Sequence, residues 1–392
     1  MRRAILLLAA VVALLLVWAQ ASGSIDRAVL AIRILDDLRR PEKSSWLDRV
    51  RSAPAPREVE WVGTHGAFKA DVYRSAESGR AMPLVFVPGA VALGKDDPRV
   101  EPFARLLAQA GFSVIVPDLP SLRTLRVQRD NLEELVSATV AIASRPEFAP
   151  DRRVGLFGVS YSGGLAIVAA LDPRLRNRVS FVATLGAYAD LDTMVRFLAD
   201  GRIVDDGVVR QLTPDPYARM VMAKTFQQFL DRTEDRAGID AMIERRTADP
   251  HAPLADLADR LSPEARVIHD LFERAGPEEA ADLIENFPSE MKRLAERLSP
   301  SRHDFTELEA RLYLAHDLRD ATIPFTESRR IAALARSHQP VRLLLLDTVR
   351  HVAPEPWQGD AVGFLTRDLP EAWRMVGWWW HLLGERGHVA KT

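Results

Sequence analysis

Cysteine is absent from this chain of 392 residues. Its absence excludes disulfide bonds, thiolate metal sites and a cysteine nucleophile. A strong charge of either sign is also missing, since 52 lysine and arginine residues against 54 aspartate and glutamate residues leave a formal net charge of −2. Proteins that bind nucleic acids carry a basic face, so this balance argues against a nucleic-acid partner.

The apolar run at the N-terminus is short for a membrane span. Ala4–Trp18 is almost purely aliphatic, Arg2 and Arg3 precede it, and Ala19-Gln20-Ala21 matches the small-x-small rule for signal-peptide cleavage. A comfortable transmembrane helix needs about 20 residues. We therefore expect residues 1–24 to be a signal peptide or a signal-anchor, with the body of the protein exported to the periplasm or the extracellular space, or anchored to the membrane.

The stretch Val154–Leu171 combines an apolar strand, a tight turn and an apolar helix. Gly158 ends the strand, and the apolar residues of the helix recur at helical spacing (Leu165, Ile167, Val168 and Leu171). The turn between them reads Gly158-Val159-Ser160-Tyr161-Ser162-Gly163-Gly164. A serine in so tight a turn is strained, with its hydroxyl above the sheet edge, and it requires small residues two positions before and after it. Gly158 and Ser162 meet that requirement around Ser160.

This turn resembles the nucleophile elbow Gly-x-Ser-x-Gly of the α/β-hydrolase family, with Ser162 in place of the second glycine. The resemblance implies that Ser160 is the nucleophile of a serine hydrolase and that the following helix directs its N-terminal amides at an oxyanion. The other register, with Ser162 as nucleophile, is rejected because Gly158 directly follows the strand and the turn has begun by Ser160.

Strands and helices alternate on both sides of a long helical stretch. Expected strands are residues 84–87, 113–116, 154–157, 179–185, 310–315 and 341–346, with two antiparallel strands before them at 58–62 and 67–74. Expected helices between them are residues 101–110, 129–143 and 324–335. This alternation predicts an α/β fold with a mainly parallel, doubly wound sheet of the α/β-hydrolase type, whose active residues lie at the carboxyl ends of strands.

The same patterns divide the chain into segments. An N-terminal helix and linker cover residues 25–56, with Ile25, Val29, Ile32 and Leu35 on one helix face. The two parts of the core are residues 57–189 and 309–392. Between them, residues 190–308 contain no expected strand and six charged amphipathic helices (194–198, 217–230, 239–246, 264–274, 277–285 and 289–298). In the family that this chain resembles, an insertion at this point is typically a helical cap over the active site.

The resemblance implies four further site residues. Pro88-Gly89-Ala90 stands where the family supplies half of its oxyanion hole, so the N–H groups of Ala90 and Tyr161 are the expected donors. His316–Pro324 resembles the acid loop, with Asp320 as the acid, and His351 follows the last strand. The order Ser160, Asp320, His351 is the order of the family's triad. Asp317, Asp190 and Asp192 are alternative candidates for the acid. Four other histidines are expected in or near the cap, and none of them follows the final strand (His251, His269, His303 and His316).

The expected activity is cleavage of carboxylic esters of a small acyl substrate through a Ser-His-Asp triad and an acyl-enzyme, with no metal and no organic cofactor. A peptidase, an amidase or an acyltransferase of the same fold, and a non-catalytic binding protein, stay open. So does the oligomeric state. The C-terminal Trp373 and Trp378-Trp379-Trp380 cannot all face one core, so at least one should be partly exposed. Core packing is the expected role of that helix, and contact with a membrane interface is the alternative.

Overall fold

The computed structural model describes residues 24–39, 54–63, 66–74, 81–249, 252–273, 277–285, 289–347, 349–350, 353–354 and 364–387. Residues 1–23, with most of the predicted signal peptide or anchor, lie outside the described residues, and so does His351. Within the described ranges, no helix combines the length and the apolar character that a membrane span requires.

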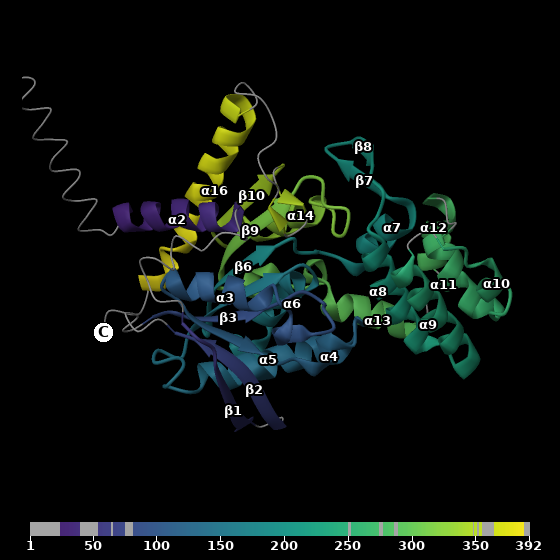
Figure 1. Cartoon of the computed structure of the whole chain (residues 1–392), viewed down its shortest axis with the longest axis horizontal. Coiled ribbons are helices and arrows are strands. Elements are labelled where there is room, and N and C mark those ends of the chain that lie inside the picture. Colours follow the sequence, from purple (N-terminus) through teal and green to yellow (C-terminus); the bar gives the residue numbers. More distant parts are fainter. Residues whose placement is uncertain are drawn as a thin grey trace, which may run out of the picture.

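A mostly parallel sheet forms the centre of the molecule (Figure 1). Its strands are β1 (Arg57–Gly63), β2 (Gly66–Tyr73), β3 (Pro83–Val87), β4 (Ser113–Pro117), β5 (Val154–Val159), β6 (Val179–Leu185), β9 (Arg311–Asp317) and β10 (Val341–Leu346). Among the described residues this eight-stranded sheet has the order β1-β2-β4-β3-β5-β6-β9-β10. β1 and β2 pair antiparallel, β2 and β4 pair antiparallel, and all later neighbours are parallel. The predicted mainly parallel sheet is confirmed.

Both faces of the sheet are covered by helices, as the alternation of strands and helices predicts (Figure 1). Successive residues of β3 alternate between two hydrophobic clusters. Leu84 and Phe86 belong to the cluster that also contains residues of α2 (Ser24–Arg39), α3 (Val100–Gln109) and α16 (Leu369–Leu382). Val85 and Val87 belong to the cluster that also contains residues of α5 (Arg129–Ala143), α6 (Tyr161–Leu171) and α14 (Thr326–Ala335). Strands buried on both faces read as continuous apolar runs, which is why these strands were recognisable in the sequence.

The helix expected at the N-terminus is present as α2, but the predicted apolar face is wrong. Leu30, Ala31, Ile34 and Leu35 are buried, whereas Val29 and Ile32 are 37% and 54% exposed. The segment is apolar on both sides, so its periodicity does not single out one face. Contact with α16 selects the face that is buried.

The tryptophans of α16 divide as expected. Trp378 and Trp379 are buried, Trp380 is partly buried, and Trp373 is 76% exposed. The Nε1 of Trp380 donates to the carbonyl oxygen of Ser24 at 3.1 Å, and Arg27 lies over the Trp380 ring. The C-terminal helix therefore holds the first turns of α2 against the body of the protein.

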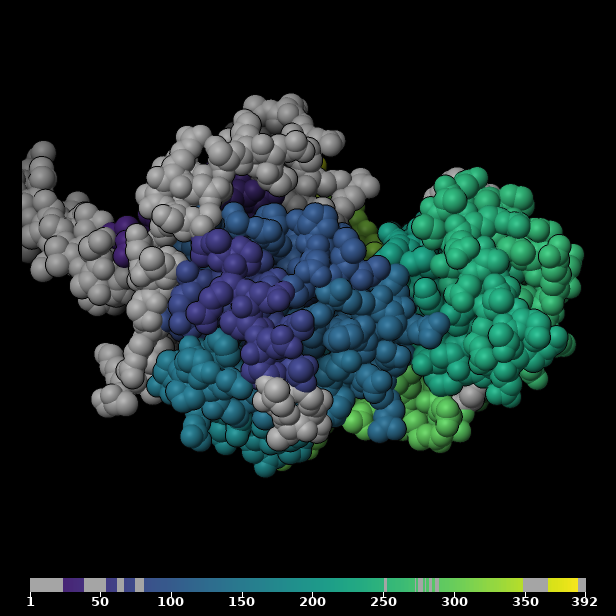
Figure 2. Space-filling view, turned by 60° about the horizontal axis from the view of Figure 1, so that its bottom comes forward, coloured from purple at the N-terminus to yellow at the C-terminus, as the bar shows by residue number. Residues whose placement is uncertain are grey.

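The long stretch between β6 and β9 is mainly helical. Its helices are α7 (Leu191–Asp200), α8 (Pro216–Phe226), α9 (Thr233–Ala248), α10 (Ala255–Ala258), α11 (Pro263–Glu273), α12 (Pro277–Glu285) and α13 (Ser289–Leu298). Figure 2 shows most of this insertion, in green, gathered into a lobe at one end of the blue core. Outside the insertion, the described residues also include the short helix α4 (Pro120–Arg123) and a two-stranded pair, β11 (Val349–Arg350) with β12 (Ala353–Pro354).

The expectation of no strand between residues 190 and 300 is wrong. β7 (Arg202–Asp205) and β8 (Val208–Gln211) form an antiparallel hairpin inside the insertion. Its turn is Asp206-Gly207, and both residues have positive φ, 48° and 79°. Asp-Gly between short apolar runs favours a two-residue hairpin turn with two positive φ angles. The signal was in the sequence, but the strands are only four residues long and lie among charged helices.

Two helical glycines provide a test of the packing. A Cβ at Gly164 in α6 would lie 2.2 Å from Cε1 of Tyr188, whereas a Cβ at Gly377 in α16 would meet nothing within 4 Å. We expect Gly164→Ala to lower the free energy of unfolding by about 1–3 kcal/mol through overpacking. Gly377→Ala should raise it by up to about 1 kcal/mol, because alanine is the better helix former. Urea unfolding of both variants measures this, and equal effects would contradict the described packing of α6 against Tyr188.

Candidate active site

Ser160 stands at a strained turn between β5 and α6. It has φ 55° and ψ −128°, a region that a residue with a side chain rarely adopts. The Ser160 N–H donates to the carbonyl of Leu185 in β6 at 2.7 Å, and the Ser160 carbonyl accepts from Gly163 N–H at 2.8 Å. Such a backbone costs about 1–3 kcal/mol and persists where the surroundings enforce it, typically at functional sites.

The close approach of strand and helix explains the small residues around Ser160. A Cβ at Gly158 would lie 2.3 Å from the carbonyl oxygen of Ser162, and a Cβ at Gly163 would lie 2.9 Å from Cβ of Ala187. Ser162 is fully buried in the first turn of α6, and its hydroxyl donates to the carbonyl of Pro88 at 2.6 Å. The serine that replaces the family's second glycine therefore ties the elbow to the loop after β3.

The loop after β3 lies directly against Ser160. A Cβ at Gly89 would be 3.3 Å from Cβ of Ser160 and 4.0 Å from its Oγ. A side chain at position 89 would therefore press against Ser160 unless one of the two backbones shifted by a few tenths of an ångström. Ala90 follows in the same loop, and Tyr161 is the first residue of α6. The two backbone segments that carry the predicted oxyanion donors thus flank Ser160.

Two residues that the sequence did not single out, Tyr188 and Asn131, contact the Tyr161 side chain. Its ring stacks on Tyr188, with centroids 5.4 Å apart and an interplanar angle of 9°. Its hydroxyl donates to Oδ1 of Asn131 in α5 at 3.0 Å. Burial raises the pKa of the Tyr161 hydroxyl well above its usual value, so the side chain stays neutral. These contacts restrict the movement of Tyr161, whose backbone N–H is one of the two predicted oxyanion donors.

The acid loop, residues 318–324, follows β9 at the carboxyl edge of the sheet. Asp320 is 1% exposed, and its Oδ1 accepts from the N–H groups of Thr322 at 2.7 Å and Ile323 at 2.9 Å. Asp317 is the last residue of β9 and is equally buried, and its Oδ1 accepts from Arg319 N–H at 2.9 Å. Both carboxylates are oriented by backbone groups within one short loop.

His316 does not lie in or near the cap, where it was expected; it lies in β9, inside the core. Its side chain is fully buried, with Nε2 2.8 Å from the Ile323 carbonyl and 3.4 Å from Oδ2 of Asp320. Its Nδ1 lies 2.7 Å from the hydroxyl of Ser328. Of the other histidines weighed against His351, His269 and His303 lie within or next to the insertion, and His251 is outside the described residues.

The strands that precede Ser160 and Asp320 end at one edge of the sheet. Gly158 of β5 pairs with Val87 of β3, and Leu346 of β10 pairs with Asp317 of β9. Parallel strands present their carboxyl ends at the same edge of a sheet. The structure places Ser160 and Asp320 at this edge, and the loop that carries His351 begins there, although His351 itself is outside the described residues.

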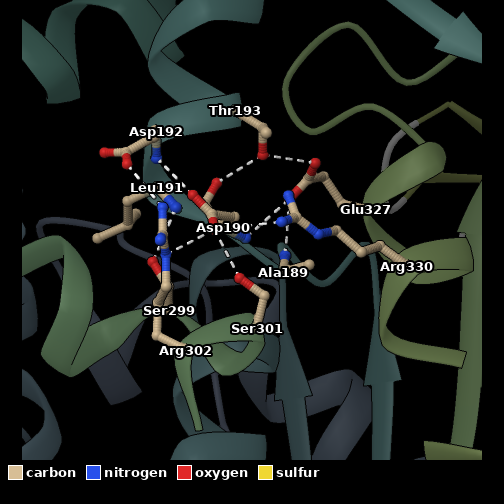
Figure 3. A network of polar contacts seen from close by, with 10 residues as sticks. All are labelled: Ala189, Asp190, Leu191, Asp192, Thr193, Ser299, Ser301, Arg302, Glu327 and Arg330. Atoms are coloured by element: carbon tan, nitrogen blue, oxygen red, sulfur yellow. Dashed lines mark hydrogen bonds and ion pairs between the residues drawn. The ribbon is translucent and has the colours of Figure 1, made fainter. Parts of the chain in front are cut away.

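The rival acids Asp190 and Asp192 belong to a different polar network, drawn in Figure 3. Asp190 is buried, and its Oδ2 accepts from the Ser301 hydroxyl at 2.6 Å and from Arg302 Nε at 3.1 Å. Arg302 also pairs with Asp192 at 2.9 Å, and Leu191 N–H donates to the Ser299 hydroxyl at 2.9 Å. These bonds join the first and last residues of the insertion to each other.

Glu327 of α14 joins the same network and was missed in the sequence. Its Oε2 accepts from the N–H groups of Ala189 at 2.8 Å and Asp190 at 2.9 Å, and its Oε1 accepts from the Thr193 hydroxyl at 2.8 Å (Figure 3). These partners of Glu327 lie 134 to 138 positions away in the sequence, so no local sequence pattern predicts the contacts. Glu327 thereby anchors the start of the insertion to the helix that follows the acid loop.

Among the residues for which the structure gives positions, no group of three or more histidine, aspartate or glutamate side chains is arranged to hold a metal ion.

Burial raises the pKa of the Glu327 carboxyl above its ordinary value of 4.5, against the opposing effect of its hydrogen bonds and of Arg330. Above pH 4.5 the folded protein therefore binds more protons at this group than the unfolded chain does. The contribution of Glu327 to the free energy of unfolding falls as the pH rises. In Glu327→Gln the amide keeps the geometry without the charge. Relative to this variant, the wild-type free energy of unfolding should fall as the pH rises from about 4.5 through the neutral range. A difference that stays constant in urea unfolding across this range would contradict the assignment.

Comparison with known proteins agrees with the architecture. A scan against protein-family models finds no match, and a search of curated proteins finds none. Solved structures do match. A mutant of the esterase rPPE has a TM-score of 0.50 and 14% identity, covering 90% of this chain and 89% of that chain. The uncomplexed acylaminoacyl peptidase of Pyrococcus horikoshii has a TM-score of 0.50 and 12% identity, covering 89% of this chain and 45% of that chain.

A puromycin-hydrolyzing peptidase of Mycobacterium tuberculosis gives a TM-score of 0.49 and 16% identity, covering 86% of this chain and 40% of that chain. This chain therefore spans less than half the length of the two peptidases and most of the length of the esterase. At these identities the likeness concerns the fold, and the chain has the fold of the α/β-hydrolases.

Proposed function

We propose that this protein is a serine hydrolase that cleaves carboxylic esters, with Ser160 as its nucleophile. The observation that carries the proposal is the conformation of Ser160, at φ 55° between a buried strand and the start of α6, with the Gly89 loop against its side chain. A structural serine gains nothing from this strain, whereas a nucleophile gains an exposed hydroxyl beside helix N-terminal amides.

In the proposed reaction the Ser160 oxygen attacks the acyl carbon while His351 takes the hydroxyl proton. The carbonyl oxygen becomes an oxyanion, and the N–H groups of Ala90 and Tyr161 donate to it. When the intermediate collapses, the C–O bond to the alcohol breaks and His351 returns the proton to the departing alcohol. Water then attacks the acyl-enzyme with His351 as base, and the carboxylic acid leaves as Ser160 regains its proton.

Asp320 is the proposed acid of the triad. Its role is to hold the imidazole in one tautomer and to stabilise the charged ring that forms during attack. Two backbone N–H groups donate to Oδ1 and fix its orientation, and Oδ2 lies 3.4 Å from Nε2 of the buried His316. Asp317 is the last residue of β9 itself, whereas Asp320 lies in the loop that follows it. A carboxylate in the loop after the strand is the better support for a histidine from the neighbouring loop.

A fluorophosphonate probe tests the nucleophile. The wild type should form a covalent adduct on Ser160, which peptide mass spectrometry locates, and Ser160→Ala should form none. Ser162→Ala is the matched control, because Ser162 is buried and donates its hydroxyl to Pro88. It should still be labelled at Ser160. An unlabelled but folded wild type favours the non-catalytic binding protein, and an adduct on Ser162 overturns the chosen register.

Two aspartate variants test the acid. Asp320→Asn should lower kcat for a p-nitrophenyl ester by about 10²–10⁴-fold, as loss of the acid does in serine hydrolases. Asp317→Asn should lower it by less than about tenfold, since the rest of the proposed triad is kept. Steady-state kinetics on both variants decide the question, and the reverse order of effects would make Asp317 the acid. The same assay run on aminoacyl p-nitroanilides shows whether amides are cleaved instead.

A further inference from the structure

A short segment of the insertion is hydrogen-bonded to both loops of the proposed active site. It comprises residues Leu212–Tyr217, between β8 and the first turn of α8. The Asp215 N–H donates to the carbonyl of Ala321, the residue after Asp320, at 2.8 Å. The Tyr217 hydroxyl donates to the carbonyl of Ala90 at 2.8 Å. We refer to Leu212–Tyr217 as the strap.

The sequence of the strap makes its backbone stiff. Asp215 stands between Pro214 and Pro216, which fix φ on both sides of it, and it has the extended conformation that a residue before proline prefers, with φ −63° and ψ 127°. Its Oδ1 accepts from Tyr217 N–H at 2.7 Å, which caps α8. The side chain of Tyr217 is therefore attached to a backbone with little freedom.

The strap is also fixed at its base. Gly201, which ends α7 with φ +72°, lies so close that a Cβ there would be 2.1 Å from the Leu212 carbonyl oxygen and 3.2 Å from Cδ of Pro214. Leu212 N–H donates to the Gly201 carbonyl at 2.9 Å. α7 in turn begins at the network of Asp190 and Glu327, which leads back to α14.

The contact of Tyr217 with Ala90 is not a consequence of burial, because Tyr217 is 44% exposed. Burial of its inner part, opposed by the charge of Arg99, raises the pKa of the Tyr217 hydroxyl, so it keeps its proton and can donate at neutral pH. A hydrogen bond on the Ala90 carbonyl restricts rotation of this residue. The N–H of the same residue is one of the two proposed oxyanion donors.

We propose that the strap sets the relative position of the oxyanion loop and the acid loop, and that Tyr217 is a positioning residue for the Ala90 N–H. This inference rests on the proposed function. The insertion then helps to position the loops of the active site, a role beyond that of a cap. The strap should stabilise the transition state more than the bound substrate, because preorganised donors must point at the place where the oxyanion develops.

Tyr217→Phe tests the strap, with Tyr313→Phe as the matched control. Tyr313 also donates its hydroxyl to an acceptor, Oε1 of Glu385, but it lies in β9 away from the strap. Tyr217→Phe should lower kcat on a p-nitrophenyl ester and the rate of fluorophosphonate labelling by about threefold to tenfold, the equivalent of one hydrogen bond. KM should change by less than about twofold, since the loss falls on the transition state.

Hydrogen–deuterium exchange provides the readout that does not depend on activity. In Tyr217→Phe, exchange should increase in peptides that contain Ala90–Gly94 and change little elsewhere in the core. Gly201→Ala, which displaces the strap itself, should increase exchange in that loop and around Ala321. Tyr313→Phe should change neither.

Unchanged exchange of the Ala90–Gly94 peptides in Tyr217→Phe would overturn the proposal that the strap holds this loop, even if the enzyme is active. Increased exchange with wild-type kcat overturns the positioning role. If the wild-type protein does not react with the fluorophosphonate, the proposed function fails instead, and exchange alone then decides whether the strap holds the two loops.

Discussion

The close contact between the end of β5 and the start of α6 is the constraint on which the rest of the site depends. Glycine at 158 and a small residue at 162 let the chain reverse direction within the turn, and Ser160 takes up the resulting strain at φ 55°. The energy for that strain comes from the buried strands and from α6, whose residues lie in the larger hydrophobic cluster. The Ser162 hydroxyl then fixes Pro88, so the turn positions the neighbouring loop as well as the serine.

The insertion between β6 and β9 is integrated into this arrangement through polar contacts at its two ends and in its middle. Asp190, Ser299, Ser301 and Arg302 join its ends, and Glu327 ties them to α14 (Figure 3). Buried networks of this kind are stable only when most of their groups find partners. A lobe built on such a base is held at a defined position relative to the carboxyl edge of the sheet, where the strap reaches the loops beside Ser160 and Asp320.

Much of the fold follows from local patterns, and much of the site does not. The apolar strands and the helix at Arg129–Ala143 were predicted with correct or nearly correct ends, because burial on both faces leaves a clear signal. The face of α2 was predicted wrongly because its partner, α16, lies more than 300 residues away in the chain. The hairpin at Asp206-Gly207 was missed although its turn signal is strong. Glu327 and Tyr217 act through partners over 120 positions distant, and no periodicity or spacing encodes such contacts.

The central claim is that the hydroxyl of Ser160 meets an acyl carbon beside two backbone donors, with the imidazole of His351 next to it. A crystal structure of the protein after reaction with a fluorophosphonate tests this most directly. We predict a phosphorus atom bonded to Oγ of Ser160, its free oxygen about 3 Å from the N–H groups of Ala90 and Tyr161, and His351 within hydrogen-bond distance of the serine oxygen. A phosphonyl oxygen directed away from both N–H groups, or an imidazole remote from Ser160, would contradict the account.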